Sequence, residues 1–289
     1  MSPSGVSAVS SSRRRRSVLP GFGLTLGFTS LYLALIVVIP LAGLLAQAGR
    51  VPWAAIGATL ANPRALAAFR VSFGISFLAA LANLPVGLLL AWALTRYPFP
   101  ARRLVDALID LPFALPTAVA GIALTALYVD DGWIGAVLAH FGIAVAFTPS
   151  GIAVALAFVG LPFVVRSIQP VLADLDRDAE EAALTLGARP GQIFWRVILP
   201  QLVPAALTGA ALAFARGVGE YGSVIFIAGN RPAISEIVPL LIVSKLEQYD
   251  YPGAALLATA MLALSLVMLL LINLAQRWTA AGDPVTHAG

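Results

Sequence analysis

Long stretches without a charged residue dominate the chain and are separated by short polar segments. The hydrocarbon core of a bilayer is about 30 Å thick, so a helix needs about 20 mostly apolar residues to cross it. Such runs predict buried helices rather than strands because strands are much shorter. Together they predict an all-α integral membrane protein with six transmembrane helices. The six predicted spans are 22–47, 71–95, 104–128, 151–172, 202–228 and 252–275.

A seventh apolar stretch, 133–147, is too short to cross the bilayer and contains His140. We interpret it as an interfacial or re-entrant helix. The number of spans also fixes whether the two termini lie on the same side of the membrane. With six spans both do, whereas a seventh would separate them.

The distribution of basic residues predicts the orientation, because Lys and Arg are retained on the cytoplasmic side. With six spans and both termini cytoplasmic, twelve basic residues lie inside and five outside. Residues 1–20 are rich in Ser and Arg and predict a disordered cytoplasmic tail. We expect one transmembrane domain over 21–278 and a cytoplasmic tail over 279–289. A cleaved signal peptide is the alternative for the first span, but its apolar run of about 25 residues is longer than a signal sequence needs.

Composition supports the membrane assignment and excludes several kinds of chemistry. Hydrophobic residues make up 60% of the 289 residues, charged residues 11%, and the mean hydropathy is +0.91. The chain has no cysteine, which excludes disulfides, thiol nucleophiles and iron–sulfur clusters. His140 and His287 are too few for a histidine metal site, so we expect no metal. The basic pI near 9.8 is explained by topology, and we expect no nucleic-acid partner.

The segment DRDAEEAALTLGARPGQIFWRVILP, residues 176–200, interrupts the apolar pattern with a cluster of charges. Asp176 or Asp178 can cap a helix over 179–186, and Gly187 can end it in the left-handed conformation. Pro190 then suits the first turn of a second helix. This predicts a cytoplasmic helix–turn–helix that presents small side chains to a partner protein. An amphipathic loop lying on the membrane surface is the alternative.

Its spacing resembles the EAA loop of ABC importer permeases. The matching residues are Glu181, Ala182, Ala183, Gly187, Ile198, Leu199 and Pro200, and only Val197 departs from the family pattern, where isoleucine is usual. The resemblance implies a type I importer permease fold (MetI-like), with the ABC core over about 67–275. It also implies that this loop couples the chain to a separate ATP-binding subunit.

A second cluster lies in the fifth predicted span, where Arg216 and Glu220 are four residues apart and would share a helix face. A charge at the bilayer centre costs about 2.5–3.5 kcal/mol, so both should face the protein interior or a wet cavity. The pair could attract and release an anion, or it could only lock helices together. The sequence leaves both readings open.

The surrounding Gly219-Glu220-Tyr221-Gly222 is similar to a signature of sulfate, thiosulfate and molybdate permeases. Residues 223–230 and the segment LPFALPTAVAGIALTALY, residues 111–128, look most like the T-type sulfate/thiosulfate subunit. Arg216, Gly219, Glu220, Tyr221 and Gly222 are therefore candidates for the translocation path. A molybdate permease is the alternative within this class.

The resemblance also implies the partners. These are a dimer of ATP-binding subunits that hold ATP and magnesium, a second homologous permease and a periplasmic sulfate-binding protein, all in or at the bacterial inner membrane and its lipid. The chain itself has no phosphate-binding G-x-x-x-x-G-K-[ST] loop, so we expect no cofactor in it and no catalytic residue.

Two other classes remain. An ion-gradient-driven secondary transporter would need ion ligands at mid-membrane, and only Arg216 and Glu220 qualify. A membrane enzyme would need a nucleophile with a base or a carboxylate pair, and Asp106 with Asp110 is a pair by spacing. Helix-end or ion-pair roles suffice for those two residues.

Overall fold

A computed structural model describes residues 22–280, with side chains described through Leu274. These residues are helices joined by turns, and no strand occurs among them. The chain divides into two units, 1–46 and 47–289. The predicted tail over 1–20 and nearly all of that over 279–289 lie outside the described residues, so the predicted domain boundaries stay a prediction.

The first unit contains one continuous helix, which runs from Phe22 into the beginning of the second unit. It consists of α1 (Phe22–Leu33), a π-helical turn η1 (Ala34–Val38) and α2 (Ile39–Ala48). Pro40 is the second residue after the π turn, and its ring would clash with the carbonyl of residue 36 in a regular α-helix. Widening the preceding turn to π geometry relieves that clash.

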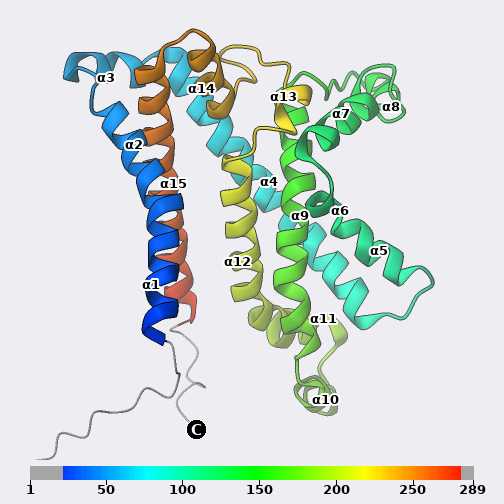
Figure 1. Ribbon diagram of the computed structural model, residues 1–289. Helices are drawn as coiled ribbons and strands as arrows, with labels where there is room; N and C mark the ends of the chain where they lie inside the picture. The colour runs from blue at the N-terminus through cyan, green and yellow to red at the C-terminus, as the bar shows by residue number, and fades with distance from the viewer. Residues whose placement is uncertain (1–21, 281–289) are drawn as a thin grey trace, which may run out of the picture. The chain divides into compact units, whose positions relative to one another are not determined.

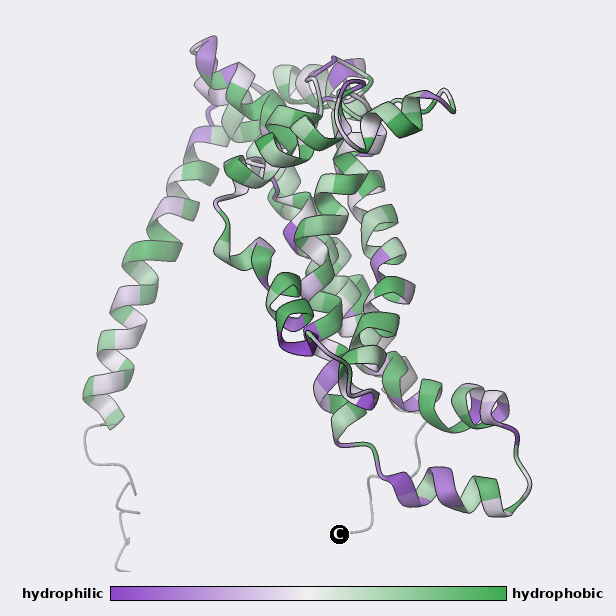
Figure 2. Ribbon diagram, turned by 90° about the vertical axis from the view of Figure 1, so that its right-hand side faces the viewer, coloured by the Kyte–Doolittle hydropathy of each residue, from purple (hydrophilic) through white to green (hydrophobic). Residues whose placement is uncertain are grey.

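In the second unit three long helices form the centre: α4 (Pro63–Arg96), α9 (Pro149–Ala173) and α12 (Leu199–Val218). They make the most extensive helix contacts of the chain (Figure 1). Figure 2 shows that these long helices are mainly hydrophobic along their length. The remaining helices of this unit are α3 (Trp53–Leu60), α5 (Arg102–Ile109), α6 (Leu111–Ala114), α7 (Thr117–Tyr128), α8 (Gly135–Ala139), α10 (Arg177–Thr185), α11 (Pro190–Ile193), the π turn η2 (Phe194–Ile198), α13 (Val224–Ile227), α14 (Val238–Glu247) and α15 (Tyr251–Ala280).

Glycines bring the three central helices into close contact. A Cβ on Gly209 of α12 would lie 2.7 Å from the Cα of Val164 on α9. A Cβ on Gly87 of α4 would lie 2.6 Å from Val164 Cγ1. Backbones that approach this closely gain van der Waals contact, which drives helix association where lipid offers no hydrophobic contrast. Val164 is fully buried between the two glycines.

Five of the six predicted spans are single helices long and apolar enough to cross a membrane within the described residues. The predicted span 104–128 is not: it is divided into α5, α6 and α7. Pro112 and Pro116 explain the breaks, because each lacks an N–H and Pro116 forces Leu115 into an extended conformation. A single continuous third helix was therefore a wrong prediction.

Two further helix predictions differ from the structure. The expected helix over 133–147 is reduced to α8, Gly135–Ala139. The fifth span begins earlier than predicted, at Pro190, and ends earlier, at Val218 rather than 228. The chain turns at Gly219, the C-cap of α12, and a separate short helix, α13, follows.

Candidate functional site

The segment 176–200 forms the predicted helix–turn–helix. Asp176 caps α10 by accepting the Asp178 N–H at 3.0 Å. Gly187 ends the helix with φ +83°, a left-handed conformation that favours glycine. The N–H of Ala188 then donates to the carbonyl of Ala183 at 3.0 Å, closing the turn. The helix begins at Arg177, two residues before the predicted start, so Glu181 lies beyond its first turn.

The second half of the segment leads into the membrane. Pro190 is the first residue of α11, as predicted, and Gln192 accepts the N–H of Arg189 at 2.8 Å. The chain then passes through η2, whose end again precedes a proline, Pro200, in the first turn of α12. Ile198 is buried in the core and anchors this entry. Leu199 and Pro200 form the first turn of α12.

None of the described residues covers the outward side of α10. Glu181 and Ala182 are exposed, and none of the residues of α10 is buried. Three apolar side chains of the loop are also open, with Leu184 53%, Leu186 88% and Trp195 68% exposed. Ala183 is turned the other way and packs against the core. A polar loop that exposes large apolar side chains is typical of a protein–protein contact.

The loop is attached to the end of α4. Arg96, the last residue of that helix, forms an ion pair with Glu180 of α10. The Arg96 guanidinium lies over the ring of Trp92, 5.4 Å from its centroid. Trp92 in turn meets Phe194 edge to face, with ring centroids 5.5 Å apart. α10 and η2 are thus both held on α4.

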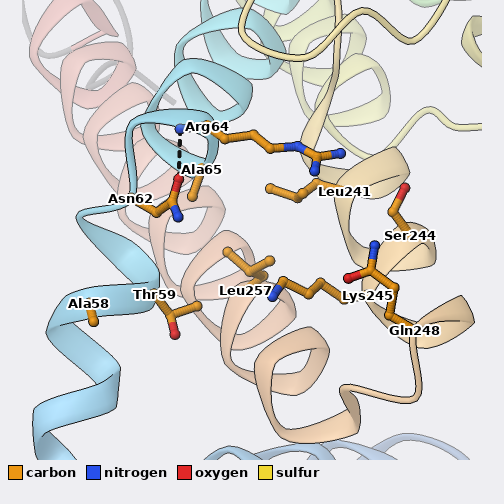
Figure 3. Close-up of a pocket in the computed structure, with 10 residues that line it drawn as sticks. All are labelled: Ala58, Thr59, Asn62, Arg64, Ala65, Leu241, Ser244, Lys245, Gln248 and Leu257. Atoms are coloured by element: carbon orange, nitrogen blue, oxygen red, sulfur yellow. Dashed lines mark hydrogen bonds between the residues drawn. The ribbon is translucent and has the colours of Figure 1, made fainter.

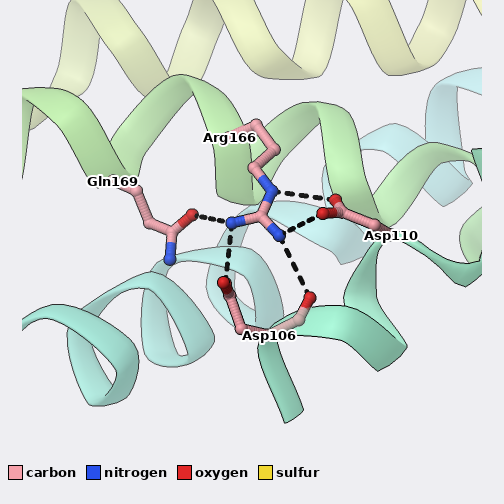
Figure 4. A network of polar contacts seen from close by, with 4 residues as sticks. All are labelled: Asp106, Asp110, Arg166 and Gln169. Carbon is pink, nitrogen blue, oxygen red and sulfur yellow. Dashed lines mark hydrogen bonds and ion pairs between the residues drawn. The ribbon is translucent and has the colours of Figure 1, made fainter. Parts of the chain in front are cut away.

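A second ion-pair network joins α5 to α9 (Figure 4). The Arg166 Nε and Nη2 atoms donate to the two carboxylate oxygens of Asp110 at 2.8 and 2.5 Å. Its Nη1 donates to Asp106 Oδ1 at 2.7 Å and to Gln169 Oε1 at 2.6 Å. The hydrogen bond from Arg166 holds the pKa of the Asp106 carboxyl below its ordinary value. The two carboxylates thus share one guanidinium, which agrees with an ion-pair role.

Arg216 and Glu220 do form the expected pair, with Arg216 Nη1 2.5 Å from Glu220 Oε2. They do not share a helix face, because α12 ends at Val218 and Glu220 lies in the turn that follows. The Glu220 side chain is 1% exposed and that of Arg216 is 38% exposed. Ser223 donates both its backbone N–H and its hydroxyl to Glu220 Oε1, each at 3.0 Å.

The turn 219–223 lies against α7. A Cβ on Gly121 of α7 would lie 2.8 Å from the Cα of Ser223, and a Cβ on Gly222 would lie 2.9 Å from Thr117 Cβ. Gly219 has open space around its Cα instead. Tyr221 packs on the hydrophobic cluster of α9 and α13. The structure thus brings the five predicted path residues together at the end of α12.

Several contacts around these sites had no local signal in the sequence. Ser223 was not expected as the partner of Glu220. Arg96 and Glu180 are 84 residues apart, and Arg166 is 56 residues from Asp110. Asp106 and Asp110 were expected only as a pair by spacing with helix-end or ion-pair roles, and Arg166 was not expected as their common partner.

The sequence profile described as "Binding-protein-dependent transport system inner membrane component" matches residues 83–282. The chain belongs to this family. The match includes the loop 176–200 and the turn 219–223. Five helices among the described residues are long and apolar enough to cross a membrane, and this family member is a multi-pass protein of the inner membrane.

Curated relatives are similar over most of the length. The sulfate transport system permease protein CysT of Salmonella typhimurium is 49% identical over 261 residues, which cover 90% of this chain and 94% of the relative. The CysT protein of Synechococcus elongatus is 49% identical over 88% of this chain and 91% of its own. A probable CysT of Marchantia polymorpha is 43% identical over 90% of each chain.

Solved structures confirm the permease fold. A chain of a bacterial ABC transporter that imports the acidic polysaccharide alginate superposes with a TM-score of 0.73 and 17% identity, over 88% of this chain and 94% of that one. A chain of an amino acid ABC transporter superposes with a TM-score of 0.55 and 20% identity, over 78% and 98%. At these identities the likeness concerns the fold alone.

Proposed function

We propose that this chain is the permease subunit of an ATP-driven importer for sulfate and thiosulfate. The observation that carries the proposal is the near half identity to sulfate transport permeases over 90% of the chain. That identity includes the segments that resemble the T-type sulfate subunit. The chain itself is non-catalytic, and ATP is hydrolysed by a partner subunit.

The exposed side of α10 is the proposed contact with the ATP-binding subunit. Leu184 and Leu186 supply open apolar area on an otherwise polar loop. Behind it, the Arg96–Glu180 ion pair and the Trp92–Phe194 contact connect the loop to α4. A movement imposed on α10 therefore reaches a helix of the central bundle. A second, homologous permease and a periplasmic binding protein would complete the importer.

At the other end of α12, Arg216 is the residue of this site best placed to meet an anion. Its side chain is 38% exposed, while Glu220 is enclosed. A guanidinium has five N–H donors, and the contact with Glu220 leaves others for a tetrahedral anion. We infer that Glu220 orients Arg216 and holds the turn rather than touching the substrate.

The deciding experiment is uptake of labelled sulfate by cells that lack this gene, with and without the restored protein. We expect the protein to restore uptake, and excess unlabelled thiosulfate to block it while molybdate does not. If sulfate uptake is unaffected by the deletion and molybdate uptake is lost instead, the importer class stands and the proposed substrate is wrong. If neither is affected, the proposal fails.

The coupling contact has a separate test. Gly187→Asp places a side chain at φ +83°, where an L-residue is strained although the space is open. We expect the variant to insert normally and to lose the ATP-binding subunit on co-purification. Gly191→Ala is the matched control, because Gly191 also has open space but ordinary backbone geometry. Retention of the ATP-binding subunit by Gly187→Asp would contradict the docking role of this turn.

A further inference from the structure

A polar pocket of about 250 Å³ lies among α3, α4, α14 and α15, and none of its lining residues belongs to the sites described above (Figure 3). Among its lining residues are two cations, Arg64 and Lys245, and no carboxylate. Uncharged hydrogen-bonding side chains and aliphatic side chains complete the lining. They are Thr59, Asn62, Ser244 and Gln248, with Ala58, Ala65, Leu241 and Leu257.

Both cations are held in place from outside the pocket. Arg64 donates through Nε and Nη2 to Glu236 at 2.7 and 2.6 Å, and the Glu236 side chain is fully buried. Lys245 donates to Asp250 at 2.8 Å, and Asp250 also accepts the Gly253 N–H at 3.0 Å. These hydrogen bonds hold the pKa of Asp250 below its ordinary value, so the Asp250 carboxylate stays ionised at neutral pH.

The ion pairs leave hydrogen-bond donors for a ligand. A guanidinium has five N–H groups, and Glu236 accepts two from Arg64. An ammonium has three, and Asp250 accepts one from Lys245. Braced donors supplied by two helices suit an anion with several acceptor oxygens. Because each cation is already paired, donor geometry rather than net charge would select the ligand.

The pocket lies near the ends of two helices that are long and apolar enough to cross a membrane, α4 and α15. Asn62 and Arg64 begin α4, whose other end, Arg96, meets the loop 176–200. Gln248 precedes α15, another apolar helix long enough to span. Exposed aromatic side chains flank the pocket in sequence, with Trp53 90%, Tyr249 79% and Tyr251 51% exposed. Tryptophan and tyrosine gather at membrane–water interfaces, where the phosphates of lipids also lie.

We propose that this pocket binds the phosphate group of a membrane phospholipid at the extracytoplasmic surface. The phosphate oxygens accept from Arg64 and Lys245. A free oxyanion offers the same oxygens, but the exposed tryptophan and tyrosine side chains that flank the pocket in sequence favour the lipid.

Native mass spectrometry of the purified full-length protein in its membrane complex tests the proposal. The probes are phosphatidylglycerol, a diacylglycerol with the same acyl chains but no phosphate, and inorganic sulfate. Lys245→Gln removes one donor. The double variant Arg64→Gln/Glu236→Gln removes the other without leaving Glu236 as an unpaired buried charge. Arg231→Gln is the matched control, because Arg231 is exposed and does not line the pocket.

We expect wild type and the control to retain an additional phosphatidylglycerol that both pocket variants lose, and diacylglycerol not to be retained. Equal retention by all four proteins would overturn the proposal. Retention of diacylglycerol as well would overturn the role of the phosphate. Binding of sulfate at this pocket without retention of phospholipid would make it a free-anion site and overturn the lipid assignment.

Discussion

Gly219 and Gly222 lie three residues apart in one turn, but only Gly222 is enclosed. Gly222 faces Thr117 of α7 so closely that a methyl group cannot fit without moving that helix. Gly219 caps α12 in open space. Glycine is therefore required by close approach at position 222, whereas Gly219 has an ordinary backbone conformation, φ −86°, that other residues can adopt.

Gly222→Ala is expected to lower stability by about 1–3 kcal/mol, the usual cost of overpacking a well-packed site. Gly219→Ala, the matched control, should change it little. The thermal unfolding of the two purified variants, followed by the loss of the monodisperse species, compares them directly. Equal unfolding midpoints of the two variants would show that α7 can move to accommodate the added methyl group without a loss of stability.

The hydrogen bond between Asp106 and Arg166 predicts that the stability of the folded protein depends on pH. Its pKa is lowered from 3.8 in the folded protein, chiefly by the hydrogen bond from Arg166. A carboxyl with a depressed folded pKa stabilises fully above its unfolded value, and this contribution is lost as pH falls through the folded pKa. Asp106→Asn should therefore be less stable than wild type near neutral pH, and the difference should shrink below about pH 4. Thermal midpoints measured across this range check it, and a difference that does not change with pH would contradict it.

Among the contacts between helices, that of α4 with α10 is the one through which a movement of the loop 176–200 would reach the central helices. The side chains of Arg96 and Glu180 are 14% and 20% exposed, so water screens their ion pair less than it would a surface pair. Trp92 and Phe194 add an aromatic contact alongside. No other described ion pair links α10 to a long helix.

Charge reversal tests this contact. Arg96→Glu and Glu180→Arg should each reduce sulfate uptake and uncouple ATP hydrolysis from transport, because each places like charges together. The double variant restores opposite charges and should recover much of the loss, with a coupling energy on the order of 0.5–3 kcal/mol. Normal membrane insertion of all three variants is the control. If the losses of uptake in the two single variants simply add up in the double variant, the ion pair does not transmit motion.

For the whole molecule, sequence reasoning found the membrane class, five of the spans and the helix–turn–helix because these depend on local signals. Apolar length sets the spans, and Asp176, Gly187 and Pro190 set the loop. The prediction of one helix over 104–128 was wrong, because the hydropathy of this segment is high throughout although Pro112 and Pro116 break the helix. The ion pair between Arg64 and Glu236 could not be predicted, because 172 residues separate the two and no sequence periodicity indicates such a contact.

The orientation in the membrane can be tested on this chain because it contains no cysteine. Asp131→Cys and Asp174→Cys place single thiols at exposed positions in the turns before α8 and α10. A membrane-impermeant maleimide should label residue 131 in cells with a permeabilised outer membrane, and residue 174 only after the inner membrane is opened. The reverse pattern would invert the proposed topology.

Val164, enclosed between Gly87 and Gly209, finally limits how this protein can change shape. Three helices whose backbones interlock at one side chain cannot slide past one another by a fraction of a turn without a collision. Any change in which side of the membrane has access to the path would then have to move these three helices together. The centre of this unit would turn as one rigid body, and rearrangement would be confined to the more loosely packed helices around it.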